Sequence, residues 1–159
     1  MAAPSPVTRT APTQPKLENG FVWKIGFSQD VDISLYEVSL NPPGLDGGDP
    51  IDVTTQWSVA LREKALRGLI DIPDFTFTCG YNPIVHSQLI AIINDNGAIS
   101  IDWPNGDKLT FYGALRVAEY DALEEGTFPM ITCTVTVTNR DPINKVQAAP
   151  VFTEGAGTG

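Results

Sequence analysis

The clearest pattern of hydrophobic and polar positions lies in residues 74–93, where the hydrophobic period changes halfway along. Phe75, Phe77 and Cys79 alternate there with threonines. A period of two in a segment rich in aromatic and β-branched residues predicts a strand with one buried face. The second half of the segment follows a helical period instead. The sequence therefore predicts a strand that is followed at once by a helix.

The expected helix has clear start and stop signals. Asn82 is a suitable N-cap, and Pro83 suits the first helical position because its missing N–H would have had no partner there. The run Asn-Asp-Asn-Gly at 94–97 ends the pattern. The apolar positions at helical spacing between these signals are Val85, Leu89, and Ile92 or Ile93. They predict one short amphipathic helix that covers an end or face left open by the strands.

Two segments nearer the N-terminus also predict strands. In residues 21–27 the large apolar side chains occupy every second position. Residues 33–40 are strand-like as well, but their apolar face changes between Leu35 and Tyr36. That change predicts either a bulge or a strand whose two faces are both covered.

The second half of the chain predicts a hairpin and a long final strand. Residues 98–103 and 107–117 each alternate, and the Asn-Gly pair between them can adopt the positive φ angles of a tight turn. Residues 119–127 are acidic and predict a connection. Residues 131–139 alternate apolar side chains with threonines, which predicts one buried wall and one outward row. This strand has no charged side chain to protect it at a sheet edge.

Two weaker features lie in the first half of the chain. Residues 41–50 contain too many prolines and glycines for a regular element and separate the strand candidates ISLYEV and IDVTTQWSV. We therefore expect a long hairpin loop, which is either a functional connection or a solvated, disordered one. Residues 57–68 predict a short helix, because Leu61, Ala65 and Leu66 cluster on one side and a glycine suits its end.

The length of 159 residues suits one domain, which buries roughly 70% of the surface that its unfolded chain exposes. We expect residues 1–16 to form a flexible arm, residues 17–147 the β domain, and residues 148–159 a flexible, glycine-rich tail. No apolar run approaches the roughly 20 residues of a membrane span, and the N-terminus lacks the pattern of a secretion signal. No membrane anchor is expected.

The charge and the cysteines narrow the possible roles. The formal net charge of −9 argues against a general nucleic-acid clamp, because such binding depends on Lys and Arg neutralising phosphates. It is compatible with a surface along which nucleic acid slides without binding. Cys79 and Cys133 lie on the apolar faces of expected strands, which favours two buried thiols in a reducing compartment. A disulfide would require neighbouring strands with Cβ atoms about 4 Å apart.

Side chains suited to catalysis or metal binding are sparse. His86 is the sole histidine, and with no partner at motif spacing a packed or surface imidazole is favoured over a catalytic one. Asp46, Asp49 and Asp52 match no calcium-loop spacing, so a solvated acidic loop is favoured. Neither a zinc-type ligand cluster nor a phosphate-binding glycine motif can be assembled. We therefore expect no enzyme, no catalytic or metal-binding residues and no cofactor.

Several signals follow one another in order along residues 21–142. They are an aromatic first strand, a long Gly/Pro-rich connection, IDVTT, LREKALRGLIDIPDFTFTCGYNP leading into a helix, the WPNGDKLTFYGAL hairpin, and TCTVTVTNRDP. This order resembles the major tail protein, or tail tube protein, of long-tailed bacteriophages. The resemblance implies a mainly β fold, an antiparallel β-sandwich or β-barrel with one flanking α-helix. It also implies hexameric rings that stack into a tube through which the genome passes.

The same resemblance implies partners, a location and one contact region. The partners would be further copies of this chain and other tail proteins such as the tape measure, tip and terminator, while DNA passes through the lumen without specific binding. The location would be the tail of the virion, after assembly in the host cytoplasm. The loop implied to contact the adjacent ring comprises Pro42, Pro43, Gly44, Leu45, Asp46, Gly47 and Gly48.

Two other functions compete with a phage tail tube. One is the tube protein of a contractile or secretion-type injection machine, which shares the ring fold. The other is a monomeric β-sandwich that binds a ligand with its loops. Electron microscopy of the purified protein at rising concentration separates the monomeric module from both tubes, and a neighbouring gene for a sheath protein favours the contractile machine.

We predict that residues 1–16 lack fixed structure in the free subunit. Their small, polar and proline-rich composition cannot offset an ordering entropy of about 1–2 kcal/mol per residue. Amide resonances of residues 2–14 in the NMR spectrum of the monomer should therefore be narrowly dispersed. Wide dispersion of these resonances would contradict the prediction.

Overall fold

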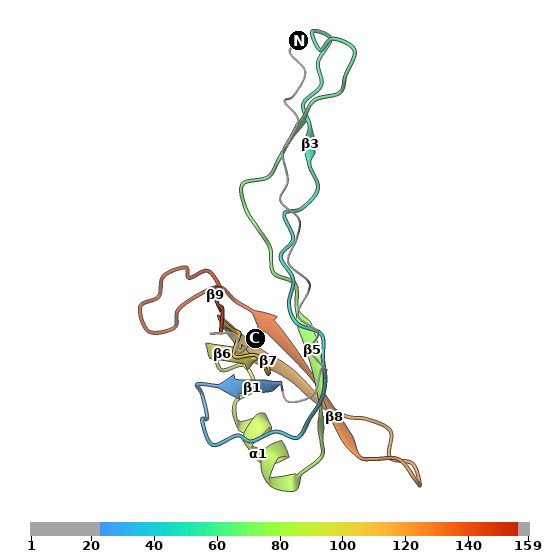
Figure 1. Ribbon diagram of the computed structural model, residues 1–159, viewed down its shortest axis with the longest axis vertical. Coiled ribbons are helices and arrows are strands. Elements are labelled where there is room, and N and C mark those ends of the chain that lie inside the picture. The colour runs from blue at the N-terminus through green and yellow to red at the C-terminus, as the bar shows by residue number, and fades with distance from the viewer. Residues whose placement is uncertain (1–22, 156–159) are drawn as a thin grey trace.

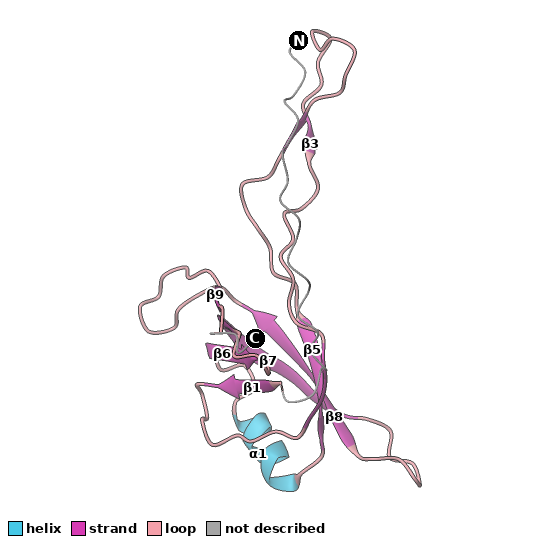
Figure 2. Ribbon diagram, viewed as in Figure 1, coloured by secondary structure: helices cyan, strands magenta, loops and turns pink. Residues whose placement is uncertain are grey.

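The described part of the chain consists of antiparallel strands and one short helix (Figure 2). The structure is a computed structural model and describes residues 23–155. The expected flexible arm, residues 1–16, lies outside the described residues. The elements are β1 (Lys24–Phe27), β2 (Glu37–Leu40), β3 (Ile51–Asp52), β4 (Lys64–Ala65), β5 (Phe75–Gly80), α1 (Pro83–Ala91), β6 (Gly97–Asp102), β7 (Lys108–Tyr120), β8 (Met130–Val137) and β9 (Val151–Thr153).

Most strands belong to one sheet with the order β1-β6-β7-β8-β5-β2, to which β9 is added at β7 (Figure 1). The strand β7 connects the two halves of this sheet. Its first half pairs with β6 and β9, and its second half pairs with β8. The strands β3 and β4 form a separate two-stranded sheet far from the rest.

The large sheet folds over on itself, so that its two halves enclose a common core. Phe27 of β1 contacts Phe77 of β5 with ring centroids 6.3 Å apart. Phe75 and Phe111 meet edge to face at 5.5 Å. The edge strands are also connected, because the backbone N–H of Ile25 donates to the Glu37 carboxylate at 3.4 Å. The expected mainly β, sandwich-like fold with one helix is therefore confirmed.

The core is made by the inward positions of the strands and by one face of α1. The alternation predicted for β5, β6 and β8 is confirmed, since every second side chain in each strand is buried. The fully buried side chains are Phe77, Leu89, Ile99, Ile101, Leu115, Ile131, Val135, Cys79 and Cys133. The threonines that alternate with them in β8 are half-buried.

The helix α1 begins and packs as its sequence predicts. The side chain of Asn82 accepts a hydrogen bond from the N–H of Ile84 at 3.0 Å, and Pro83 occupies the first position. Val85 and Leu89 are buried against the sheet. The chain leaves the helix through Asn94, whose positive φ of 62° lies in the left-handed region that asparagine tolerates.

Cys79 and Cys133 lie on the neighbouring strands β5 and β8 as fully buried, free thiols. The sequence could not show that these strands pair. Contact with the Cys79 thiol, together with burial, raises the pKa of the Cys133 thiol. A neutral thiol pair is therefore part of the core, as free cysteines in apolar surroundings usually are.

Several details of the strands refine the predictions. Residues 33–40 do contain a bulge, because the register of β2 against β5 shifts between Glu37 and Ser39, which is C-terminal to the expected change of apolar face. The β6–β7 turn exists, but only Gly106, with φ of 91°, has a positive φ in it. The acidic connection is shorter than expected, since β7 continues to Tyr120.

Two predictions about secondary structure are wrong. No helix forms in residues 57–68, which instead turn back and contribute β4. The tail after residue 148 contains regular structure, because Val151–Thr153 pairs with β7. The sequence left open whether β8 lies at an edge, and the structure places it inside the sheet between β7 and β5. Its uncharged threonine row therefore needs no protection against edge pairing.

We predict that Leu115→Ala lowers the free energy of unfolding by about 2–5 kcal/mol, because it leaves a cavity where both halves of the sheet meet. Chemical denaturation measures this change. The matched control is Leu69→Ala, where the side chain is 84% exposed and the expected change is below about 0.5 kcal/mol. Equal effects of the two substitutions would contradict the assigned core.

Candidate assembly arm

A long hairpin joins the paired strands β2 and β5 and projects away from the sheet (Figure 1). We call residues 41–74 the arm. At its base the N–H of Asn41 donates to the carbonyl of Thr76 at 3.1 Å. The strands β2 and β5 are therefore hydrogen-bonded to each other up to the point where the arm begins. Residues 41–50 are one leg of the arm. The expected simple hairpin loop between two long strands is therefore wrong, because IDVTTQWSV continues the arm.

The two legs of the arm are held together at intervals along their length. Asp46 and Asp71 exchange two backbone hydrogen bonds of 2.8 and 2.7 Å. Farther out, β3 pairs with β4. Between these points the Arg67 Nε donates to the carbonyl of Asp49 at 2.8 Å. Gly48 has a positive φ of 70°, and a Cβ there would lie 3.0 Å from the Arg67 side chain. The backbone thus defines the shape of the arm.

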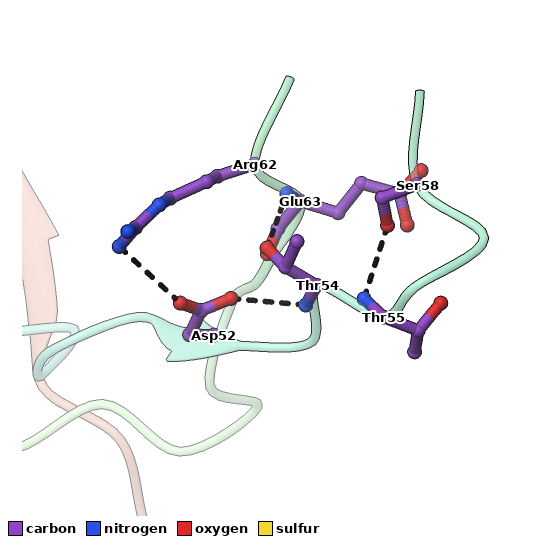
Figure 3. Close-up of polar contacts among 6 residues, drawn as sticks. All are labelled: Asp52, Thr54, Thr55, Ser58, Arg62 and Glu63. Carbon is purple, nitrogen blue, oxygen red and sulfur yellow. Dashed lines mark hydrogen bonds and ion pairs between the residues drawn. The ribbon is translucent and has the colours of Figure 1, made fainter. Parts of the chain in front are cut away.

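Short polar side chains fix the outer part of the arm (Figure 3). The N–H of Thr54 donates to Asp52 at 2.9 Å, and the N–H of Glu63 donates to the Thr54 hydroxyl at 3.0 Å. Hydrogen bonds from Thr54 hold the pKa of Asp52 below its usual value. The Arg62 guanidinium lies 3.9 Å from the same carboxylate, across the two legs. Both ends of this ion pair are exposed, so it contributes little stability.

Most large apolar side chains of the arm face solvent, and the exception is Ile72 near its base, which is buried. Trp57 is 83% exposed and Leu66 is 86% exposed. Single exposed apolar residues are ordinary, but a succession of them along one projecting element marks a contact surface for another molecule. The other large apolar side chains exposed on the arm are Leu45, Ile51, Val53, Val59, Leu61, Leu69 and Ile70.

The residues expected to contact an adjacent ring lie together on the inner part of the arm. They do not all have the same surroundings. Asp46 is paired with the opposite leg, and Gly47 and Gly48 follow it toward the tip. Leu45 remains 72% exposed. Pro42, Pro43, Gly44 and Leu45 line an apolar groove of about 460 Å³ beside Trp103 and Phe152.

The outer arm was missed by the sequence interpretation. Trp57, Val59 and Leu61 are as exposed as Leu45 or nearly so, yet the sequence patterns assign them to a strand and a helix. Their alternation favours a strand and contradicts the helical period that starts at the same tryptophan. Neither element forms, because the chain turns at Trp57 and bends at Ala60, whose φ is 66°. What the sequence lacks is any signal that this segment would leave the sheet.

The side chains considered for chemistry lie in separate places in the described structure. His86 Nδ1 lies 2.7 Å from the Tyr120 hydroxyl, and its ring packs on that tyrosine. Desolvation and the neighbouring Tyr81 raise the pKa of Tyr120. Asp46, Asp49 and Asp52 do not converge, and residues 23–155 contain no cluster of potential metal ligands. In the same range no helix is long and apolar enough to span a membrane.

Comparison with known proteins gives a likeness of fold. No protein-family model and no curated protein matches the chain. A chain in the "Cryo-EM structure of the anti-feeding prophage (AFP) baseplate, 6-fold symmetrised" matches with a TM-score of 0.59 and 8% sequence identity. The match covers 91% of this chain and 99% of that chain. The two chains therefore share a fold, and at this identity the likeness concerns the fold alone.

We predict that the subunit folds without the outer arm. Asp46 and Asp71 form a hydrogen-bonded antiparallel pair, which is the geometry that a two-residue Asn-Gly turn closes. In the arm-less variant, Asn-Gly replaces residues 47–70. Its thermal midpoint, followed by circular dichroism, should stay within about 3 °C of the wild type, because the removed side chains are exposed. A drop of about 10 °C or more would show that the arm supports the core.

Proposed function

We propose that this chain is a structural subunit of a phage tail tube, which forms hexameric rings that stack into a conduit for the genome. The observation that carries the proposal is the arm, an extended hairpin with exposed apolar side chains that its own sheet does not need. Exposed apolar surface of this kind often marks a site that another molecule covers. A stacked ring provides that cover in every repeat of a tube.

The fold of the sheet supports ring formation. Its outermost strands, β1 and β2, each have four residues and pair on one side only within the described chain. Apart from the Ile25 N–H, which donates to Glu37, the outer edges of these strands could pair with neighbouring copies, and closed rings remove such edges. The similar baseplate structure is six-fold symmetrised, which agrees with a ring of six. The shared fold is thus compatible with a symmetric assembly.

The charge of the chain suits a conduit for DNA. A net charge of −9 disfavours attachment of phosphates, so DNA would pass along the tube without specific binding. The partners in this proposal are other copies of the chain and the tape measure, tip and terminator proteins of a tail. The particle would be assembled in the host cytoplasm, and the chain would then remain in the virion.

A second candidate function is a tube subunit of a contractile or secretion-type injection machine. It is favoured by the similar fold in the anti-feeding prophage baseplate. Both candidates require stacked rings and assign the same role to the arm. A gene for a sheath protein next to the gene for this chain would favour the second candidate over a non-contractile tail.

We predict that the purified wild-type protein assembles into rings and tubes at rising concentration, whereas the arm-less variant forms no tubes. The physical reason is that the deletion removes the exposed apolar surface and leaves the sheet intact. Negative-stain microscopy and light scattering provide the measurement. The control is Ile143→Ala in the β8–β9 connection. It removes an apolar side chain that is as exposed as Leu66 of the arm and should leave assembly unchanged.

Two results would contradict this proposal, the first only in the role of the arm and the second in the tube itself. Normal tubes from the arm-less variant would make the arm a passive connection. A monomer at every concentration, even with the other tail proteins supplied, would instead indicate a monomeric binding module.

A further inference from the structure

An aromatic surface lies at the end of the subunit opposite to the arm. The β7–β8 connection projects there, beside the start of α1, while the arm leaves from the other end of the same strands (Figure 1). Tyr36 and Leu123 are each 73% exposed. We call this surface the aromatic end and define it by Tyr36, Tyr81, Tyr120, Leu123 and Phe128, all of which are exposed.

The aromatic end has a defined shape. The rings of Tyr36 and Phe128 lie 6.1 Å apart, and those of Tyr81 and Tyr120 lie 5.3 Å apart. These pairs border two hollows of about 270 and 500 Å³. Gly80 lies between Tyr36 and Phe128, and a Cβ there would come within 3.1 Å of the Phe128 ring. The hollows are therefore large enough to accept apolar side chains of another molecule.

The arm as a whole carries six carboxylates, Asp46, Asp49, Asp52, Glu63, Asp71 and Asp74, but one basic segment within it is complementary in charge to the aromatic end. Glu119, Asp121, Glu124 and Glu125 lie around the aromatic end, and residues 117–130 contain no Lys or Arg. The basic residues of the arm all lie within residues 62–67, as Arg62, Lys64 and Arg67 with one glutamate among them. An acidic aromatic surface attracts such a segment by charge and by cation–π contact.

We propose that the aromatic end of one subunit binds the outer arm of a second copy of this chain. In this arrangement Trp57 and Leu61 enter the hollows, and Arg62 and Lys64 approach Glu124 and Glu125. The proposal rests on the proposed stacking of rings and names the surface that receives the arm.

The placement of the two surfaces determines the kind of assembly. The arm and the aromatic end lie on opposite ends of one subunit, so each copy presents one of each (Figure 1). A contact between two different surfaces of identical chains is heterologous and repeats head to tail. Because the arm points along the long axis, the repeat extends along that axis instead of closing in a pair. All rings of the tube would then face the same way.

Charge reversal on the two sides tests the contact. We expect R62E/K64E or E124K/E125K alone to raise the protein concentration needed for tubes roughly tenfold, because like charges then meet. The variant with all four substitutions should assemble within about threefold of the wild-type concentration, since the pairs are restored with opposite sign. The control R140E/K145E changes two charges in the β8–β9 connection and should have no effect.

A cysteine pair tests the proximity directly. One preparation carries Trp57→Cys and the other carries Leu123→Cys, and the native thiols remain unreactive because both are fully buried. Mixing under mild oxidation should give a disulfide between the two preparations, detected on a non-reducing gel. Leu69→Cys in place of Trp57→Cys is the control, because it is equally exposed but lies on the inner part of the arm.

The outcomes separate this inference from the proposed function. If the arm-less variant forms no tubes, yet charge reversal has no effect and no mixed disulfide forms, the stacking role stands and the aromatic end is not the receptor. If the wild type forms no tubes, the proposed function fails, and the cysteine experiment alone decides whether the arm binds this surface. Loss of tubes in both charge variants without recovery in the combined variant would also overturn the proposed pairing.

Discussion

The long strand β7 is the element on which the rest of the structure depends. Its first half holds β6 and β9, and its second half holds β8, so both halves of the folded sheet are attached to one strand. Its register against β8 shifts between Leu115 and Val117. Such a bulge bends a strand and increases its twist, which lets one strand serve both halves of a sandwich. Leu115, fully buried beside this bend, lies where the halves meet.

Because β7 organises the core, the connections between strands are free to serve other purposes. The arm, the β7–β8 connection and the β8–β9 connection all leave a sheet whose strands are already paired (Figure 1). The arm contributes no side chain to the central hydrophobic cluster. Its exposed apolar residues therefore contribute little to folding, and in the proposed assembly they would be buried between copies. A subunit built in this way can change its contacts without losing its fold.

The sequence predicts the elements whose period is strict. The alternation in Phe75–Gly80 and the Asn82 cap of α1 follow from local chemistry, and the structure confirms both. It could not predict the arm, because Trp57, Val59 and Leu61 are apolar yet extend into solvent, and local patterns assign apolar residues to a core. The position of β8 in the interior of the sheet also depends on long-range pairing that no local pattern records. The sequence therefore located only part of the candidate contact surface, namely residues 42–48 on the inner arm.

The composition of the two ends explains why assembly need not compete with solubility. The aromatic end is surrounded by carboxylates, so isolated subunits repel one another through like ends. The arm has apolar side chains, but the polar contacts at Asp52, Thr54 and Glu63 and the β3–β4 pair hold its two legs against each other. In the proposed contact between the basic segment 62–67 and the acidic aromatic end, apolar burial and charge act in the same direction. A polar, unidirectional polymer follows from this pairing more readily than a closed dimer does.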